Sequence, residues 1–233
     1  MSQSFDYQYM NCKLRALFIT CLSIIGWASA QSDSLLLTKN FKFQDGIYLD
    51  FNDLQQNRPT YRWDEVSARM ATSDEGFIAQ VERIRKDQQL LDLSQVWGIC
   101  IGGIPYIRLP EGEVTESATV FAGLRVRGKI SYFKYKTIVT EMKEVKAYNP
   151  LNGRAFRQGK VPVERTVERE QMLHWEDGTI VDFTVANFLE WIQDDRQLWR
   201  AVRDLSPEDA EEKLFQCLLI YADRSKVFLK TGD

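Results

Sequence analysis

The sequence contains a single histidine, His174, among its 233 residues, and it lacks the short motifs that mark several enzyme classes. It has no Gly-x-Ser-x-Gly nucleophile elbow, no His-Glu-x-x-His zinc helix, no phosphate-binding Gly-x-x-x-x-Gly-Lys-Ser/Thr loop and no Gly-x-Gly-x-x-Gly fingerprint. No Cys-x-x-Cys or His-x-x-x-His spacing is present to bind zinc. We therefore assign no catalytic residue, no metal ligand and no cofactor from the sequence.

Long hydrophobic runs are also missing, apart from one near the N-terminus. Lys13 and Arg15 precede a mainly apolar run of about twelve residues, Ala16–Trp27, and small residues follow at Ala28–Ala30. This order is typical of a secretory signal peptide, whereas a membrane-spanning helix needs about 20 apolar residues. We predict a signal peptide over residues 1–30, cleavage before Gln31 and no transmembrane anchor after processing. The protein is then periplasmic, on the cell surface or extracellular.

The start of translation stays open between Met1 and Met10, because residues 1–9 contain no basic side chain. Cleavage would remove two of the 30 basic residues and one of the 33 acidic residues, which leaves a formal charge of −4. This small negative charge argues against nucleic acid as a partner.

Cysteine is scarce, with four in the whole chain and two after the expected cleavage site, Cys100 and Cys217. In an oxidising compartment these two allow a single disulfide. The alternative is two separate buried thiols, because cysteine also packs as a small apolar residue.

Turn residues and alternating apolar residues predict strands in the first three quarters of the chain. Examples are 46–51, and 96–101 with 104–109 as a hairpin around Gly102-Gly103, with Pro105 at a sheet edge or bulge. Residues 77–85 fit either a helix or a strand, and we favour the strand. Further strands are expected at 120–126 and 129–139, a turn at 149–153, and a hairpin from 172–175 to 179–183. Asn52 is expected to cap a short helical turn, and residues 60–76 are expected to be irregular.

Apolar residues repeat with a helical period after Phe183. Thr184 is a suitable helix N-cap, and Ser206 followed by Pro207 and Asp209 predicts the start of the last helix. Strands first and helices last predict the α+β class: a mostly antiparallel sheet with a C-terminal helical cluster packed on it. We expect a loose leader over residues 31–40 and a single domain over 41–233.

Charge is unevenly distributed along the chain. Residues 125–160 contain ten basic and two acidic residues, whereas 176–212 contain eleven acidic residues and three arginines. The two segments can neutralise each other within the molecule, or the basic strands can bind an anionic ligand such as an envelope glycan. For ligand binding the candidates are Lys129, Tyr132, Lys134 and Lys136.

Two further features admit a catalytic interpretation. His174 can serve as a general base, but without a motif around it we favour a histidine at the surface or one hydrogen-bonded within the strand. Glycoside hydrolysis needs only two suitably spaced carboxylates, which no short motif encodes. The visible candidates are Asp194-Asp195 and Glu111-Gly112-Glu113, and solvated loop charges are the alternative.

Three segments resemble a family of uncharacterised exported bacterial proteins. They are Asp45–Asp53 (DGIYLDFND), the hairpin from Trp97-Gly98 to Tyr106-Ile107, and the Asp177-Gly178 turn that leads to Phe188-Leu189 and Asp194-Asp195. The resemblance implies export and a single domain, and it carries no activity. We expect a non-catalytic binding or envelope-associated module with a protein or anionic glycan partner. The alternative is an envelope glycan hydrolase.

Overall fold

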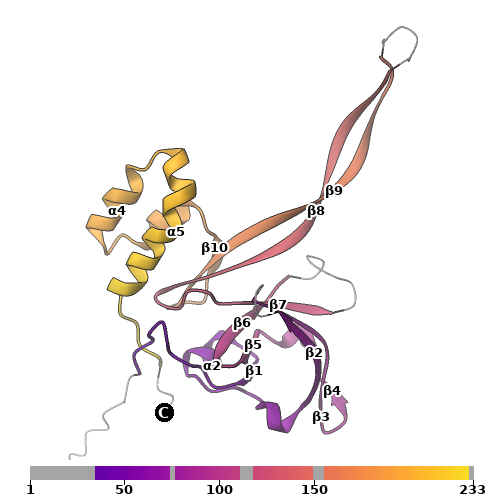
Figure 1. Ribbon diagram of the computed structural model, residues 1–233. Helices are drawn as coiled ribbons and strands as arrows, with labels where there is room; N and C mark the ends of the chain where they lie inside the picture. Colours follow the sequence, from indigo (N-terminus) through magenta and orange to yellow (C-terminus); the bar gives the residue numbers. More distant parts are fainter. Residues whose placement is uncertain (1–34, 74–76, 111–117, 149–154, 231–233) are drawn as a thin grey trace, which may run out of the picture. The chain divides into compact units, whose positions relative to one another are not determined.

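The computed structural model describes residues 35–73, 77–110, 118–148 and 155–230, all within one unit, Ser34–Asp233 (Figure 1). The expected signal peptide, the turn expected at 149–153 and the candidate acids Glu111 and Glu113 lie outside these residues. In the described part the strands are mostly antiparallel and the helices follow near the C-terminus, which confirms the expected α+β class.

Seven strands of the described residues form one antiparallel sheet in the order β1-β5-β6-β7-β3-β2, with β4 paired to β3. The strands are β1 Gly46–Tyr48, β2 Ser67–Ser73, β3 Ile78–Lys86, β4 Gln89–Leu90, β5 Gly98–Ile101, β6 Ile104–Arg108 and β7 Thr119–Gly123. The β5–β6 hairpin is confirmed, and Gly102 and Gly103 adopt φ values of 62° and 80°, which favour glycine.

Three local predictions for this sheet are wrong. Asp50, not Asn52, caps the short helix α2 (Phe51–Gln55), since its carboxylate accepts a hydrogen bond from the backbone N–H of Asp53. Residues 60–76 include the 3₁₀ helix η1 (Trp63–Glu65) and β2, because β2 pairs with β3. Pro105 lies on an interior strand, where the ladder to β7 begins one residue later at Tyr106.

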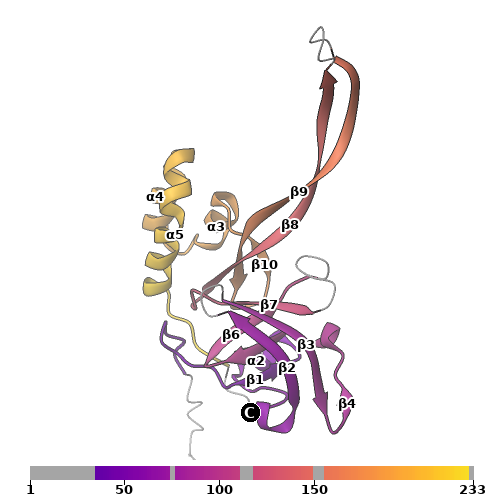
Figure 2. The ribbon, with the colours of Figure 1, turned by 45° about the vertical axis from the view of Figure 1, so that its right-hand side comes forward.

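The second sheet has the order β10-β9-β8. Its strands are β8 Ile130–Tyr148, β9 Ala155–His174 and β10 Ile180–Asp182, so the expected hairpin around residues 176–178 is confirmed. Strands β8 and β9 form a long two-stranded ribbon, visible in Figures 1 and 2, and they pair from Ile130–His174 to Tyr148–Ala155. Up to the pair Ala147–Arg157, even-numbered residues of β8 lie opposite even-numbered residues of β9, and odd-numbered residues lie opposite odd-numbered ones. We therefore call the face with the even-numbered side chains the even face and the other the odd face.

Three helices follow β10: α3 Val185–Trp191, α4 Arg196–Arg203 and α5 Pro207–Arg224. Their N-caps are Thr184, Asp195 and Ser206, and each side chain accepts a hydrogen bond from a backbone N–H in the first turn. The expected caps at Thr184 and Ser206 are therefore confirmed. No helix among the described residues is long and apolar enough to span a bilayer.

The base of the ribbon is covered on both faces. On the even face, Tyr132 and Met172 join a core cluster with the helices, which includes Phe188 and Leu218. On the odd face, Phe133 and Leu173 join a cluster with residues of β6 and β7. The chain segment before β1 is bound as well, because Leu37 is buried and its N–H donates to the carbonyl of Val227. Part of the expected leader, residues 35–40, therefore contacts the domain through Leu37.

Candidate functional site

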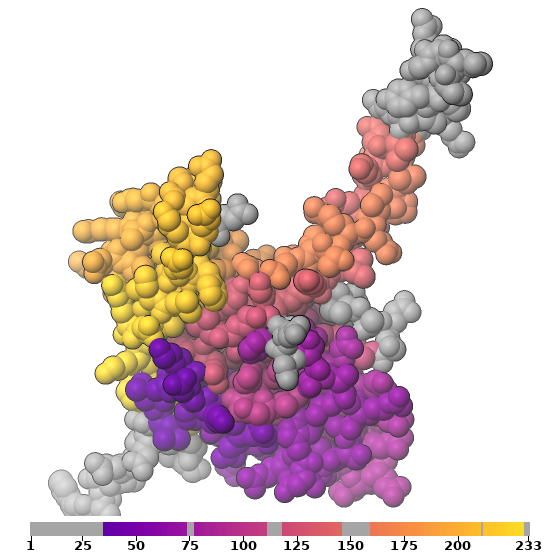
Figure 3. Space-filling model, viewed as in Figure 1, coloured from indigo at the N-terminus to yellow at the C-terminus, as the bar shows by residue number. Residues whose placement is uncertain are grey.

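The distal half of the ribbon, residues 138–145 paired with 159–166, exposes apolar side chains on both faces. The most exposed of them are Ile138 (55%), Met142 (60%), Val145 (46%), Val161 (42%) and Val163 (41%). Ile138 and Met142 lie on the even face, and the three valines lie on the odd face. This part of the ribbon is at the surface in Figure 3, in salmon and orange. Several exposed aliphatic side chains on one element mark an interaction surface more often than isolated ones do.

Several β-branched residues favour the extended conformation of these two segments. Val139, Val161 and Val163 are β-branched and favour strands. Pro162 cannot donate a ladder hydrogen bond, yet it is tolerated because it lies on β9 opposite Met142, beyond the point where β10 ends. In the distal ribbon, β8 and β9 therefore extend beyond the core, and their outer edges have no strand partner among the described residues.

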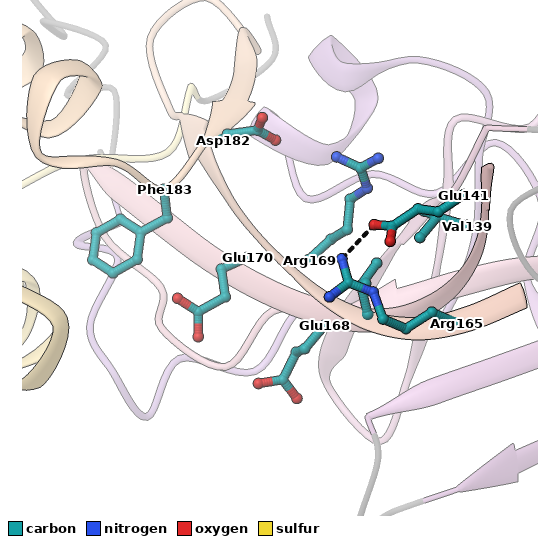
Figure 4. Close-up of a pocket in the computed structure, with 9 residues that line it drawn as sticks. Val139, Glu141, Arg165, Glu168, Arg169, Glu170, Asp182 and Phe183 are labelled. Carbon is teal, nitrogen blue, oxygen red and sulfur yellow. Dashed lines mark hydrogen bonds and ion pairs between the residues drawn. The ribbon is translucent and has the colours of Figure 1, made fainter. Parts of the chain in front are cut away.

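A hollow of about 590 Å³ lies where the ribbon leaves the core (Figure 4). Val139 and Phe183 supply apolar lining, and an ion pair of 2.6 Å joins Glu141 of β8 to Arg165 of β9 in the wall of the hollow. The hollow borders the part of β9 that β10 does not cover, because the last hydrogen bond on that side runs from the Phe183 N–H to the Glu170 carbonyl. This geometry suits a bound chain segment better than a small molecule, since the hollow is shallow and rich in charge.

The four predicted ligand-binding residues have different roles in the structure. Lys129 forms an ion pair of 2.8 Å with Asp194, and Lys134 forms one of 2.8 Å with Glu168. Tyr132 is buried, and its hydroxyl donates to Glu170. Lys136 is exposed on the even face. Tyr132, Lys134 and Lys136 follow one another on the even face, but Tyr132 is buried, and Lys129 lies in the turn before β8.

Lys129 and Asp194 form a polar connection between the turn before β8 and the helices. Burial opposes ionisation of Asp194, but hydrogen bonds from Lys129 and from the Tyr221 hydroxyl outweigh it and lower the pKa of the carboxyl group. The hydrogen bond to Asp194 in turn raises the pKa of Lys129. The contact joins the basic and acidic segments of the chain, as one of the two charge interpretations expects.

The adjacent carboxylate of Asp195 has different partners. It accepts the N-cap hydrogen bond from the Leu198 N–H and pairs with Arg224 at 3.0 Å, and the N-cap bond is the larger cause of its lowered pKa. A glycosidase requires one carboxylic acid that stays protonated near neutral pH, which means a raised pKa. Both Asp194 and Asp195 have lowered values, so this pair does not provide that acid.

His174 ends β9 with its ring against the indole of Trp191, 5.1 Å between centroids. Its Nδ1 lies 3.1 Å from Oδ1 of Asp177, and the same oxygen accepts a hydrogen bond from the Thr179 N–H. The histidine is thus part of the β9–β10 turn, which fits the interpretation as a hydrogen-bonded strand histidine.

Cys100 and Cys217 are both free in the structure. Cys100 is buried in β5 with its Sγ 3.4 Å from Oδ1 of Asp45, and burial raises the pKa of its thiol. Cys217 is half-buried in α5, and burial raises the pKa of its thiol too. The structure therefore has two separate thiols. Among the described residues, no group of three or more His, Cys, Asp or Glu side chains is placed to hold a metal ion.

Sequence reasoning missed the strand character of residues 155–171 and with it the distal ribbon. The available signal was the alternation of Val161 and Val163, but charged residues such as Glu164 and Arg165 occur on both faces of the same stretch. Comparison of the chain with family models, curated proteins and solved structures gives no match. The candidate site therefore depends on the geometry alone.

Proposed function

We propose that this protein is an exported, non-catalytic binding module whose distal ribbon, residues 138–145 and 159–166, engages a protein partner at the cell envelope. The observation that carries the proposal is the exposure of apolar side chains on both faces of this ribbon. Export is supported by the basic, apolar and small-residue pattern of residues 13–30.

The energetics of a two-stranded ribbon support a partner. An isolated hairpin is at best marginally stable in water, and stability normally needs a third strand or a packed face. The base of the ribbon has both, with β10 beside it and core clusters on its faces, but the distal half has neither among the described residues. A partner that covers one face would bury aliphatic surface, at a gain of about 25 cal/mol per Å².

Among the described residues, the catalytic candidates Asp194 and His174 have partners within the fold. Lys129, Asp194 and Tyr221 form one such group, and His174 with Asp177 forms another. Since these contacts hold turns and helix ends in place, the structure favours binding over the alternative of an envelope glycan hydrolase.

The experiment compares the natural protein with two variants in cells treated with a protein cross-linker. The first variant replaces residues 138–166 by Asn-Gly, which joins the cross-strand partners Thr137 and Val167 through a two-residue turn. The second changes Ile138, Met142, Val161 and Val163 to threonine, which retains strand propensity and length.

We expect both variants to lose the cross-linked adducts of the natural protein while their unfolding midpoints stay close to that of the natural protein. A matched control changes the exposed Phe215 and Leu219 on α5 to threonine, and this control should keep the adducts. Adducts that survive in both ribbon variants would contradict the proposal.

A further inference from the structure

The outer edge of β8 is open along the distal ribbon. On that side Tyr132 exchanges backbone hydrogen bonds with Val126, and beyond it no described residue pairs with β8. Because peptide groups point alternately to the two sides of a strand, Tyr132 fixes the direction for the even-numbered residues that follow. The N–H and C=O groups of Ile138, Thr140 and Met142 therefore face the open edge.

The side chains along this edge are complementary to a second copy of the same strand. An antiparallel pair related by a two-fold axis at Thr140 places Thr140 opposite its equivalent. In the same register Ile138 faces Met142 of the second copy, and Lys136 faces Glu144. Each pair occurs twice by symmetry, and no two like charges between residues 135 and 145 lie opposite each other.

The complementarity extends across all four strands of the resulting sheet. Lys136 has Glu168 as its partner in β9, and Glu144 has Lys160. On the even face one row across the sheet therefore reads Glu168, Lys136, then Glu144 and Lys160 of the second copy. The charges alternate along the whole row, and the neighbouring row brings Ile138 next to Met142 of the second copy. Opposite charges and apolar pairs directly across an antiparallel ladder are stabilising.

The outer edge of β9 does not have this property. β10 occupies it at residues 171–173. A two-fold axis at Thr166 would place Glu164 opposite Glu168, and one at Val167 would place Arg165 opposite Arg169. Like charges directly opposite are destabilising, so β9 disfavours pairing with itself in these two registers.

We infer that a second copy of this chain adds to the outer edge of β8 in the register centred on Thr140, which joins two ribbons into a continuous four-stranded antiparallel sheet. This inference rests on the proposed function of the distal ribbon and names a second copy as its occupant. The interface is isologous, so it closes at a dimer and leaves the odd and even faces of the joined sheet available to other partners.

A cysteine at the two-fold axis tests the register. The experiment uses the full-length gene product purified as the host processes it, with Cys217→Ser to remove the half-exposed thiol. In this background Thr140→Cys places one thiol of each copy at the two-fold axis. The two Cα atoms are then about 5.5 Å apart, within the range that a disulfide bridges. The matched control is Glu164→Cys, because Glu164 lies opposite Thr140 on the same face but on the other strand. We expect a disulfide-linked dimer with Thr140→Cys only. Equal cross-linking of both variants, or none with either, would overturn the inference.

Charge reversal provides a second test by sedimentation equilibrium. Lys136→Glu and Glu144→Lys should each weaken the dimer about ten-fold or more, because each substitution alters two symmetry-related pairs. The double variant restores opposite charges between positions 136 and 144 of the two copies and should recover most of the affinity of the dimer. Single and double variants that dimerise equally well would overturn the inference. If Thr140→Cys fails to cross-link while the threonine variant still loses its adducts, the ribbon binds another protein and the proposed function stands without this inference.

Discussion

The side-chain amide of Gln55 in α2 donates a hydrogen bond to the backbone carbonyl oxygen of Trp175, 120 residues further along the chain. The same buried side chain accepts a hydrogen bond of 2.7 Å from the amine of Lys230. One glutamine thus connects the short helix after β1, the end of β9 and the C-terminal segment.

Replacement of Gln55 by leucine should destabilise the protein by about 1–3 kcal/mol, because the carbonyl of Trp175 loses a buried donor and Lys230 loses its acceptor. The free energy of unfolding in urea measures this. The neighbouring Gln56→Leu is the control, because Gln56 is only half-buried, and a change within about 0.5 kcal/mol is expected there. Equal effects of the two substitutions would show that the contacts of Gln55 contribute little.

Lys129→Met should cost about 1 kcal/mol near neutral pH, because the lysine is mostly buried while Asp194 is half-exposed. The pKa of Asp194 is lowered in the folded state, so its contribution is present above the unfolded pKa of about 3.9 and is lost as the pH falls through the folded value. The pKa of Lys129 is raised, so its contribution is present below about 10.4 and is lost as the pH rises through the folded value.

The cost of Lys129→Met should therefore be largest between these limits and decrease at both ends, when unfolding is measured as a function of pH. Lys226→Met, at an exposed position near the same helices, is the control. A cost that does not change with pH would show that Lys129 stabilises the fold through its hydrocarbon chain alone.

Leu218 and Leu219 are adjacent in α5, and the first is fully buried while the second is 42% exposed. Leu218→Ala should destabilise the protein by about 2–5 kcal/mol, whereas Leu219→Ala should stay within about 0.5 kcal/mol. Thermal unfolding of the two variants distinguishes them. The half-buried Leu189 in α3 should give an intermediate value on truncation.

The two thiols should react at different rates with an alkylating reagent in the absence of a reductant. Cys217 is partly accessible and should be labelled in the folded protein, but Cys100 is buried and should be labelled only on unfolding. Mass spectrometry of the peptides measures both. Protection of both thiols that a reductant removes would instead indicate a disulfide.

Export predicts the mass of the protein in the envelope fraction. Processed protein should begin at Gln31, so its intact mass should lack residues 1–30. A mass that still includes residues 10–30 would contradict the predicted cleavage.

The helices could be predicted because their signals are local. Thr184 and Ser206 cap helices whose apolar residues recur every three to four positions, and a cap acts within one turn. The 155–171 part of β9 could not be predicted in the same way, because β8 defines it through pairs up to 38 residues apart, such as Phe133 with Gln171. Charged residues on both of its faces removed the alternation that indicates a half-buried strand.

The burial of Tyr132 could not be predicted for a related reason. Tyr132 is interleaved with lysines, which favoured a binding surface, but the base of the ribbon is covered on both faces and the tyrosine is buried against the helices. Whether one face or both faces of a strand are covered depends on elements distant in the sequence. For the same reason, the sequence does not distinguish the exposed apolar residues beyond the base, on which the proposed function depends, from apolar residues of the core.

The ladder between β8 and β9 runs without a register shift from Ile130–His174 to Ala147–Arg157. Among the described residues of the ribbon, those that join the core clusters lie near the base: Ile130, Tyr132, Phe133, Tyr135, Met172 and Leu173. Insertion or removal of one residue in each strand beyond the base would therefore change the reach of the ribbon by about 3.4 Å and leave every core contact in place. An unmatched single residue would instead exchange the two faces on one strand. The length of the ribbon can thus change by matched pairs of residues without a change in the domain that supports it.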